Sequence, residues 1–308
     1  MKGLEISRQY YTSYGAPMIA EQFPHLESLI AVGLVGSGSE CYGFDDEISR
    51  DHDFEPGFCL FIPDDERIDN KMVFALERAY SKLPNEFMGL TRLKQQPVGG
   101  SRHGVIRISD FYLEKIGLSD GNLSLYDWFR IPEYALAEAT NGEVFRDDLK
   151  VFTNIRNRIL QQPEDVRKKK LAGHILMMAQ SGQYNYSRCL AHGETGAAQM
   201  ALLEFVNHAM HSIFLLNQKY MPFYKWSFRA LRNLPVLGKC EKDLEFLISQ
   251  PNADHFPHQK KEIIENLATN VIDVLRVGTG NDLETCAYLI NESISDGRLR
   301  NEHILLAI

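Results

Sequence analysis

Two aspartates, Asp51 and Asp53, are separated by one residue and precede an apolar run. In an extended segment, residues i and i+2 point to the same face, so these two carboxylates are expected to lie side by side. Carboxylates that close repel each other unless a cation lies between them, and hard oxygen ligands suit Mg²⁺. The spacing therefore predicts that Asp51 and Asp53 bind Mg²⁺.

A glycine-rich turn, Gly36-Ser37-Gly38-Ser39, precedes this pair, and thirteen residues separate Ser37 from Asp51. Nothing bulky covers its backbone N–H groups, and such groups bind phosphate. Gly36, Ser37 and Ser39 are therefore the predicted nucleotide-binding residues. A phosphate-binding turn and a metal-binding carboxylate pair are the minimum set of groups that metal-assisted nucleotidyl transfer requires. In the alternative interpretation, the turn is a plain connection and the aspartates belong to a solvated acidic segment.

The elements that must position these groups are short strands and helices. Apolar runs at residues 30–35 and 58–62 predict two strands joined by the turn and a short acidic connection. A third strand is predicted over residues 104–108. Helical spacing of apolar residues from Met72 to Leu83 predicts a helix that Pro84 ends, and a leading helix is expected within the first 29 residues.

The string GSGSECYGFDDEISRDHDF, residues 36–54, resembles the signature of the polymerase-β-like nucleotidyltransferase superfamily. The full string resembles one bacterial branch that carries only a domain-of-unknown-function label. The resemblance implies an α+β fold, in which a nucleotidyltransferase core made of a small mixed sheet with flanking helices is followed by an all-helical bundle domain. It also implies an Mg²⁺-dependent enzyme that uses an NTP, with ATP favoured, as co-substrate.

The superfamily resemblance implies a third carboxylate, usually on a later strand, that acts as a metal ligand or general base. Asp110 is the nearest candidate, although its place at a strand-to-helix joint suits helix capping equally well. Glu55, Asp46 and Glu133 are rival candidates. The predicted third strand carries Arg107 where an acid is expected, so the identity of the base stays open.

The second half of the chain is predicted to be helical, which places a domain boundary near residue 150. Residues 1–150 would form the core with its N-terminal helix, and residues 151–308 a helical bundle that completes a cleft. Residues 202–216 predict an apolar helix in the middle of the bundle. On it, His208 and His211 are expected to be polar groups at the edge of the core. The run 168–170, three lysines, predicts a solvated helix face or, alternatively, a phosphate or acceptor contact.

The string LNQKYMPFYKW, residues 216–226, resembles the helical companion domain of kanamycin-type nucleotidyltransferases. In that domain a lysine meets the triphosphate, and the matching residue here is Lys225. The resemblance therefore implies that Lys225 contacts the nucleotide. The alternative is an aromatic-rich helix joint with a lysine whose charged end reaches solvent.

Composition limits the classes of partner and compartment. The net charge of −8 excludes nonspecific nucleic-acid binding, which needs clustered Lys and Arg. Five scattered cysteines without a CxxC pair favour free thiols in a reducing compartment. No signal-peptide pattern is found at the N-terminus, and no apolar run approaches ~18 residues. The sequence therefore predicts a cytoplasmic protein without a membrane span, and leaves the oligomeric state open.

The predicted activity is transfer of an NMP, with AMP favoured, from an NTP to an acceptor hydroxyl. A small-molecule acceptor is favoured, since a negatively charged protein attracts a cationic, aminoglycoside-like alcohol. A protein hydroxyl is the alternative acceptor, as in an AMP-transferase of toxin–antitoxin type. A non-catalytic nucleotide sensor is the alternative outside enzymes.

Overall fold

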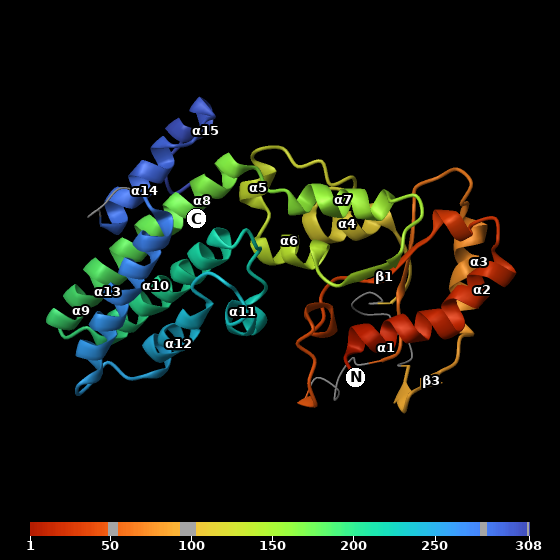
Figure 1. Ribbon diagram of the computed structural model, residues 1–308, viewed down its shortest axis with the longest axis horizontal. Helices are drawn as coiled ribbons and strands as arrows, with labels where there is room; N and C mark the ends of the chain where they lie inside the picture. Colours follow the sequence, from red (N-terminus) through yellow and green to blue (C-terminus); the bar gives the residue numbers. More distant parts are fainter. Residues whose placement is uncertain (49–54, 93–102, 278–281, 307) are drawn as a thin grey trace. The chain divides into compact units, whose positions relative to one another are not determined.

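A computed structural model describes residues 1–48, 55–92, 103–277, 282–306 and 308 (Figure 1). Asp51 and Asp53 therefore lie outside the described residues. The chain divides into two compact units, the first made of Met1–Ser124 and Ala135–Gln161, and the second of Leu125–Tyr134 and Gln162–Ile308. This division differs from the single predicted boundary near residue 150, because the chain leaves the first unit at residue 125 and returns to it at 135.

The first unit contains a four-stranded mixed sheet. Its strands are β1 (Ala31–Leu34), β2 (Cys59–Ile62), β5 (Gly104–Arg107) and β6 (Glu143–Arg146), in the spatial order β5-β2-β1-β6. β1 is antiparallel to β2 and β6, and β2 is parallel to β5. The three strands predicted from apolar runs are thus confirmed, and β6 is added at one edge. A separate hairpin joins β3 (Glu86–Phe87) to β4 (Leu90–Thr91).

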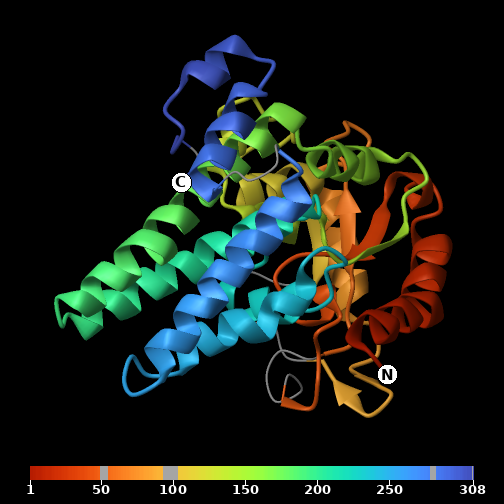
Figure 2. The ribbon, with the colours of Figure 1, turned by 60° about the vertical axis from the view of Figure 1, so that its left-hand side comes forward.

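Helices cover both faces of this sheet (Figure 2). Along β2, Leu60 and Ile62 point to one face, where they pack in a buried cluster with residues of α1 (Gly3–Tyr10) and α3 (Asn70–Ser81). Phe61 points to the other face. There its ring stacks on Phe152 of α7 (Val151–Leu160) at 4.1 Å and meets Phe111 of α4 (Ile108–Ile116) edge-on at 5.2 Å. The central strand is therefore buried on both sides.

Helix ends differ in detail from the sequence prediction. The leading helix runs as α1, a π-helical segment (Tyr11–Gly15) and α2 (Ala16–Gln22). α4 begins at Ile108, directly after β5, so Asp110 lies in its first turn and is not its N-cap. Residues 127–140 form two helices, α5 (Asp127–Arg130) and α6 (Glu133–Thr140), because Pro132 disfavours helical backbone at the residue before it.

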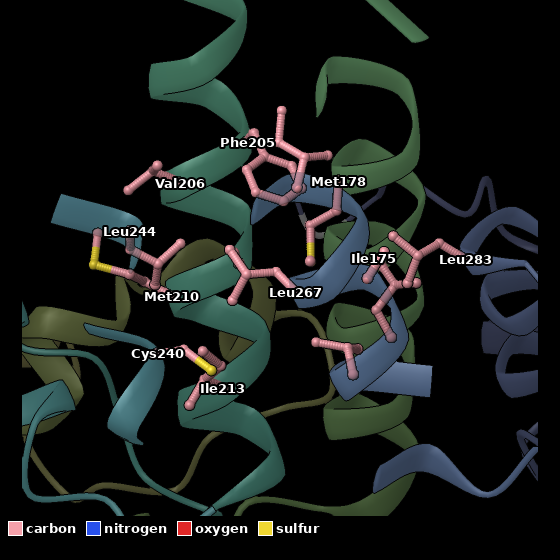
Figure 3. Close-up of a cluster of buried hydrophobic side chains, with 14 of the residues drawn as sticks. Ile175, Met178, Phe205, Val206, Met210, Ile213, Cys240, Leu244, Leu267 and Leu283 are labelled. Atoms are coloured by element: carbon pink, nitrogen blue, oxygen red, sulfur yellow. The ribbon is translucent and has the colours of Figure 1, made fainter. Parts of the chain in front are cut away.

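The second unit is helical. Besides α5, its elements are α8 (Glu164–Met178), a π-helical segment (Ala179–Tyr186), α9 (Ser187–Ala191), α10 (Thr195–Leu216), α11 (Tyr224–Leu231), α12 (Glu241–Ser249), α13 (Phe256–Leu275), α14 (Leu283–Glu292) and α15 (Gly297–Asn301). α8 packs against both α10 and α14. Figure 3 shows the core between these helices, in which Ile175, Phe205 and Leu267 are buried. The central position predicted for residues 202–216 is confirmed.

The predicted fold class is confirmed, since an α+β unit with a small mixed sheet is followed by a helical bundle. All five cysteines are free. In the part of the chain that the structure describes, no helix is long and apolar enough to cross a membrane.

Replacing Gly142 by alanine tests the close approach of β6 to β1. Gly142 has φ +63°, and a Cβ there would lie 2.0 Å from the Leu34 carbonyl oxygen. We expect Gly142→Ala to lower the free energy of unfolding by about 2–5 kcal/mol, since left-handed strain and overpacking add together. Gly117 at the end of α4 has φ +74° with nothing near its Cβ position, so Gly117→Ala should cost only about 1–2 kcal/mol. Equal losses in urea unfolding of the two variants would contradict the close contact.

Candidate functional site

One edge of the sheet gathers the predicted phosphate-binding turn and several polar side chains. The strand registers pair Gly33 with Cys59, Cys59 with Gly104, and Leu34 with Glu143. The C-terminal end of β1 therefore lies beside the N-terminal ends of β2, β5 and β6. The segments that reach this edge are the turn after β1 and the residues just before the other three strands.

The turn is held by the side chain of Asn141. Gly36 donates its N–H to Asn141 Oδ1 at 2.9 Å, and Asn141 Nδ2 donates to the Gly36 carbonyl at 2.8 Å. Gly36 has φ +124°, a conformation that glycine adopts at no steric cost. The Gly36 N–H, which was predicted to contact phosphate, is thus already bonded, and the role of Gly36 is to set the shape of the turn.

The next three residues carry backbone donors. Within the part of the chain that the structure describes, the N–H groups of Ser37, Gly38 and Ser39 donate to no protein acceptor. The carbonyls of Gly38 and Ser39, in contrast, accept from Cys41 and Tyr42. Ser37 is exposed and Gly38 half-buried, so solvent reaches this segment. A run of three unbonded N–H groups favours an anion.

A lysine that the sequence analysis did not single out lies beside this turn. Lys115 Cε is 3.7 Å from the position that a Cβ on Gly36 would take. Its ammonium pairs with Glu138 at 3.2 Å and with Glu114 at 3.3 Å. In the sequence, Lys115 lies four residues after Phe111, a spacing that places both side chains on one face of a helix. Phe111 also lies near Gly36. The sequence alone could not place Lys115 beside Gly36, because the turn and α4 are far apart in the chain.

Of the four acids considered as a third carboxylate, Glu55 is the one just before β2, at the edge that carries the turn. Its Oε1 lies 3.1 Å from Nδ1 of His103, which is buried just before β5. Asp110 follows the opposite end of β5 and is exposed in α4. Asp46 is exposed, and Glu133 belongs to the second unit. The geometry therefore favours Glu55 over Asp110.

The metal prediction depends on Asp51 and Asp53, which lie outside the described residues, and it stays a prediction. Among the residues that are described, no group of three or more His, Cys, Asp or Glu side chains could hold a metal ion. Lys225 belongs to the second unit, where it is exposed in α11 and lies 5.1 Å from the ring centre of Trp226. Its contact with a nucleotide likewise stays a prediction.

The second unit holds a buried cluster of titratable side chains that the sequence analysis missed. Glu133 Oε2 lies 3.2 Å from His211 Nδ1 and accepts from the Met221 N–H at 3.3 Å, while Glu133 Oε1 lies 3.7 Å from Lys170 Nζ. His174 lies against the same cluster, and its ring stacks on that of His211 with centroids 4.5 Å apart.

The cluster continues from His174 to His208 and Glu204 of α10, and Glu204 is exposed. His174 Nδ1 lies 2.8 Å from His208 Nδ1, and His208 Nε2 lies 3.3 Å from Glu204 Oε1. His208 is buried and His211 lies at the edge of the core. The prediction of a core-edge position is therefore right for His211 and wrong for His208, because α8 covers that side of α10.

The predicted solvated face at residues 168–170 is also wrong for two of the three lysines. Lys169 and Lys170 are both buried. Lys169 Nζ donates to Asn291 Oδ1 at 2.8 Å and to the Glu302 carbonyl at 2.6 Å. The reason is tertiary, since α8 lies between α10 and α14 and so has little face left for solvent.

Burial shifts the protonation equilibria of the cluster. Burial raises the pKa of Glu133, but the hydrogen bond from His211 and the charge of Lys170 outweigh it, so the net pKa is lowered. Burial lowers the pKa of Lys170, against the opposing effect of Glu133. Burial, with the neighbouring His211 and His208, lowers the pKa of His174 well below its ordinary range. Burial likewise lowers the pKa of His208. At neutral pH Glu133 is ionised, and His174 and His208 are neutral.

Comparisons with known proteins describe part of the chain. The family model "Domain of unknown function (DUF4037)" matches residues 128–227, 100 of the 308 residues. This agrees with the predicted domain-of-unknown-function label, although the match covers Lys225 and the buried cluster and leaves out the turn and the aspartate pair. The kanamycin-type character of the C-terminal domain stays a prediction.

No curated protein matches the chain. Among solved structures, the chain is similar to a nucleotidyltransferase-like protein from Exiguobacterium sibiricum 255-15, at 10% identity over 88% of this chain and 80% of that one. The TM-score is 0.35, which is too low to establish a shared fold.

The neutral buried histidines predict a loss of stability on mild acidification. The unfolded chain binds a proton on each histidine as the pH falls through about 6.5, whereas the lowered pKa values of His174 and His208 keep these side chains neutral to a lower pH in the fold. The unfolded state then binds more protons, so the free energy of unfolding should fall by up to about 1.4 kcal/mol per pH unit for each histidine. The histidine contribution is full above this window. Glu133, whose pKa is lowered in the fold, contributes stability throughout the window and loses it only at lower pH.

The pH slope is measured by urea unfolding between pH 5.5 and 8. His174→Phe should reduce the change in unfolding free energy per pH unit by the contribution of one proton, up to about 1.4 kcal/mol. His192→Phe, at an exposed position after α9, should leave the slope unchanged. An unchanged slope in His174→Phe would show that His174 is not held neutral in the fold.

Proposed function

We propose that this protein is a cytoplasmic, Mg²⁺-dependent nucleotidyltransferase that transfers an NMP, with AMP from ATP favoured, to an acceptor hydroxyl. The observation that carries the proposal is the run of N–H groups at Ser37, Gly38 and Ser39 that donate to no acceptor among the described residues. These three residues follow the buried strand β1. The motif Asp51-x-Asp53 comes after them in the sequence. Phosphate-binding donors and paired acids in that order support phosphoryl chemistry.

The donor set fits the metal that the resemblance implies. Asp51 and Asp53 would hold Mg²⁺, since both are hard carboxylate ligands, and Glu55 follows them at the edge of the sheet that carries the turn. When bound, Mg²⁺ neutralises charge on the phosphates. The N–H groups of Ser37 to Ser39 bind and orient the phosphates. Lys115 lies beside Gly36, with its ammonium paired to Glu114 and Glu138.

We assign Glu55 in place of Asp110 as the third carboxylate. Glu55 is paired with His103 at 3.1 Å, and this contact holds the carboxylate in place. A carboxylate beside an imidazole is suited to accept the proton that the acceptor hydroxyl loses. The acceptor stays open between a small molecule and a protein hydroxyl.

Neutralising either aspartate tests the metal assignment. We expect Asp51→Asn and Asp53→Asn each to weaken Mg·ATP binding more than roughly tenfold, a loss of over ~1.4 kcal/mol, without lowering the melting temperature. Isothermal titration with and without Mg²⁺ measures the affinity. Asp46→Asn, an exposed acid of the same connection, is the matched control and should bind as wild type does. Wild-type affinity in both aspartate variants would refute the assignment.

Release of pyrophosphate separates the enzyme from the sensor. Wild-type protein supplied with labelled ATP and a fractionated cell extract should release pyrophosphate and label a small molecule or a protein. Nucleotide binding without pyrophosphate release across all fractions would favour the non-catalytic sensor.

Lys225→Ala tests whether the second unit contributes to nucleotide binding. A charge-assisted hydrogen bond to phosphate contributes ~1.5–3 kcal/mol, so the variant should bind ATP roughly tenfold to a hundredfold more weakly and bind AMP nearly as before. Lys225→Arg should recover part of the affinity. Lys219→Ala, at an exposed lysine six residues earlier, is the matched control. An equal loss for ATP and AMP, or no loss, would show that Lys225 does not contact the β- and γ-phosphates.

A further inference from the structure

The second unit contains a cavity of about 410 Å³, within the size range of small-molecule sites. It lies among α5, the start of α6, α8, α10 and residues 221–224. Its floor is polar and includes Glu133, Lys170, His174 and His211. Apart from Ile308, every residue that lines it falls in the segment matched by the family model.

The charged pair on the floor has unused hydrogen-bonding capacity. In the described part of the chain, Glu133 Oε1 has no hydrogen-bond partner, and its 3.7 Å separation from Lys170 Nζ exceeds hydrogen-bond length. The Lys170 ammonium, with three donors, likewise makes no hydrogen bond to any described residue. Both side chains are at most 5% exposed.

Two other buried lysines of this unit show that such capacity is not a general feature of its core. Lys169 donates to Asn291 and to the Glu302 carbonyl. Lys260 donates to the Gln250 carbonyl at 2.6 Å and to Asn252 Oδ1 at 2.8 Å. These two ammonium groups are bonded by neutral oxygens and stabilise the fold. Lys170 differs, because it makes no hydrogen bond to a described residue and lies beside a cavity. A buried charge without hydrogen bonds is costly.

The hydrogen-bond pattern assigns the histidine tautomers. Glu204 Oε1 accepts from His208 Nε2–H, so Nδ1 of His208 accepts from His174 Nδ1–H. Nε2 of His174 is then an acceptor. The 3.2 Å contact of His211 Nδ1 with Glu133 Oε2 assigns a proton to Nδ1, so His211 donates to Glu133. The floor therefore offers one ammonium donor, one carboxylate oxygen without a partner among the described residues, and an imidazole acceptor on His174.

The rim of the cavity is aromatic. Tyr134, Phe223 and Tyr224 line it and are 43%, 42% and 76% exposed. Phe223 contacts both tyrosine rings, with centroids 5.6 Å and 4.3 Å apart. Exposed aromatic rings grouped at a cavity mouth mark a binding surface, and they suit the flat apolar face of a ring.

We infer that this cavity binds a neutral polyhydroxylated ring, a sugar or cyclitol. A balanced carboxylate and ammonium favour an uncharged ligand over an anion or cation. A hydroxyl both donates and accepts, so adjacent hydroxyls satisfy Glu133, Lys170 and the imidazole acceptor of His174 together. The C–H face of the ring packs on the aromatic rim. This site belongs to the second unit and is independent of nucleotidyl transfer.

Saturation-transfer NMR on the full chain tests the inference with D-glucose, D-galactose, D-mannose and myo-inositol as probes. At least one of these should bind at millimolar concentration. D-glucosamine and D-glucuronate, the cationic and anionic rings of the same size, should bind at least tenfold more weakly than the best neutral probe.

Variants locate the binding. Tyr224→Ala, at an exposed rim position, and the near-isosteric Glu133→Gln should each weaken binding at least tenfold. Tyr126→Ala, an exposed tyrosine of the same unit outside the cavity, should bind as wild type does. Because Tyr224 is on the surface, its loss does not threaten folding even if Glu133→Gln does.

Three results would overturn the inference. The first is no binding of any neutral ring at 50 mM, a level that detects ligands ~1,000-fold weaker than micromolar ones. The second is binding that persists unchanged in Tyr224→Ala. The third is preferential binding of a charged ring, or of a nucleoside or amino acid added as a competitor, which would assign the cavity to another ligand class.

Discussion

The double hydrogen bond between Asn141 and Gly36 is the constraint on which the first unit's site depends. One amide side chain satisfies both backbone groups of Gly36. It therefore holds the conformation of the residue that leads into the N–H groups of Ser37, Gly38 and Ser39. The bond also requires β6 to lie directly against β1, which Gly142 permits because it has no Cβ. The shape of the turn, the position of β6 and the close contact at Gly142 therefore depend on one another.

Much of the first unit follows from local pattern. The strands at residues 31–34 and 59–62 lie within apolar runs, and the strand at residues 104–107 contains the apolar pair Val105-Ile106. Apolar runs of this length predict strands. Asn141 was not predicted, because its partner is 105 residues away in sequence and no local period marks it. Glu55 was considered only as a rival to Asp110, since sequence alone does not tell which end of β5 faces the turn.

In the second unit, the helices could be predicted from the apolar periods of the sequence, but the contacts that fix its buried polar residues could not. Lys169 and Lys170 follow Lys168 in a run that is typical of a solvated face, and burial on α8 is decided by α10 and α14 together. The partner of Lys170 is Glu133, which stands before α8 on another helix. Charges held by long-range partners leave no signal in the local sequence.

The path of the chain between its two units has a consequence for how the protein can be divided. Leu125–Tyr134 belongs to the second unit, although the chain then returns to the first unit until Gln161. A fragment that begins at residue 162 would therefore lack Phe129, Glu133 and Tyr134, and would leave Lys170 without its carboxylate. Neither unit is a continuous stretch of chain, so recombination between relatives at a single crossover would separate residues that work together. The two units are expected to be inherited and expressed as one piece.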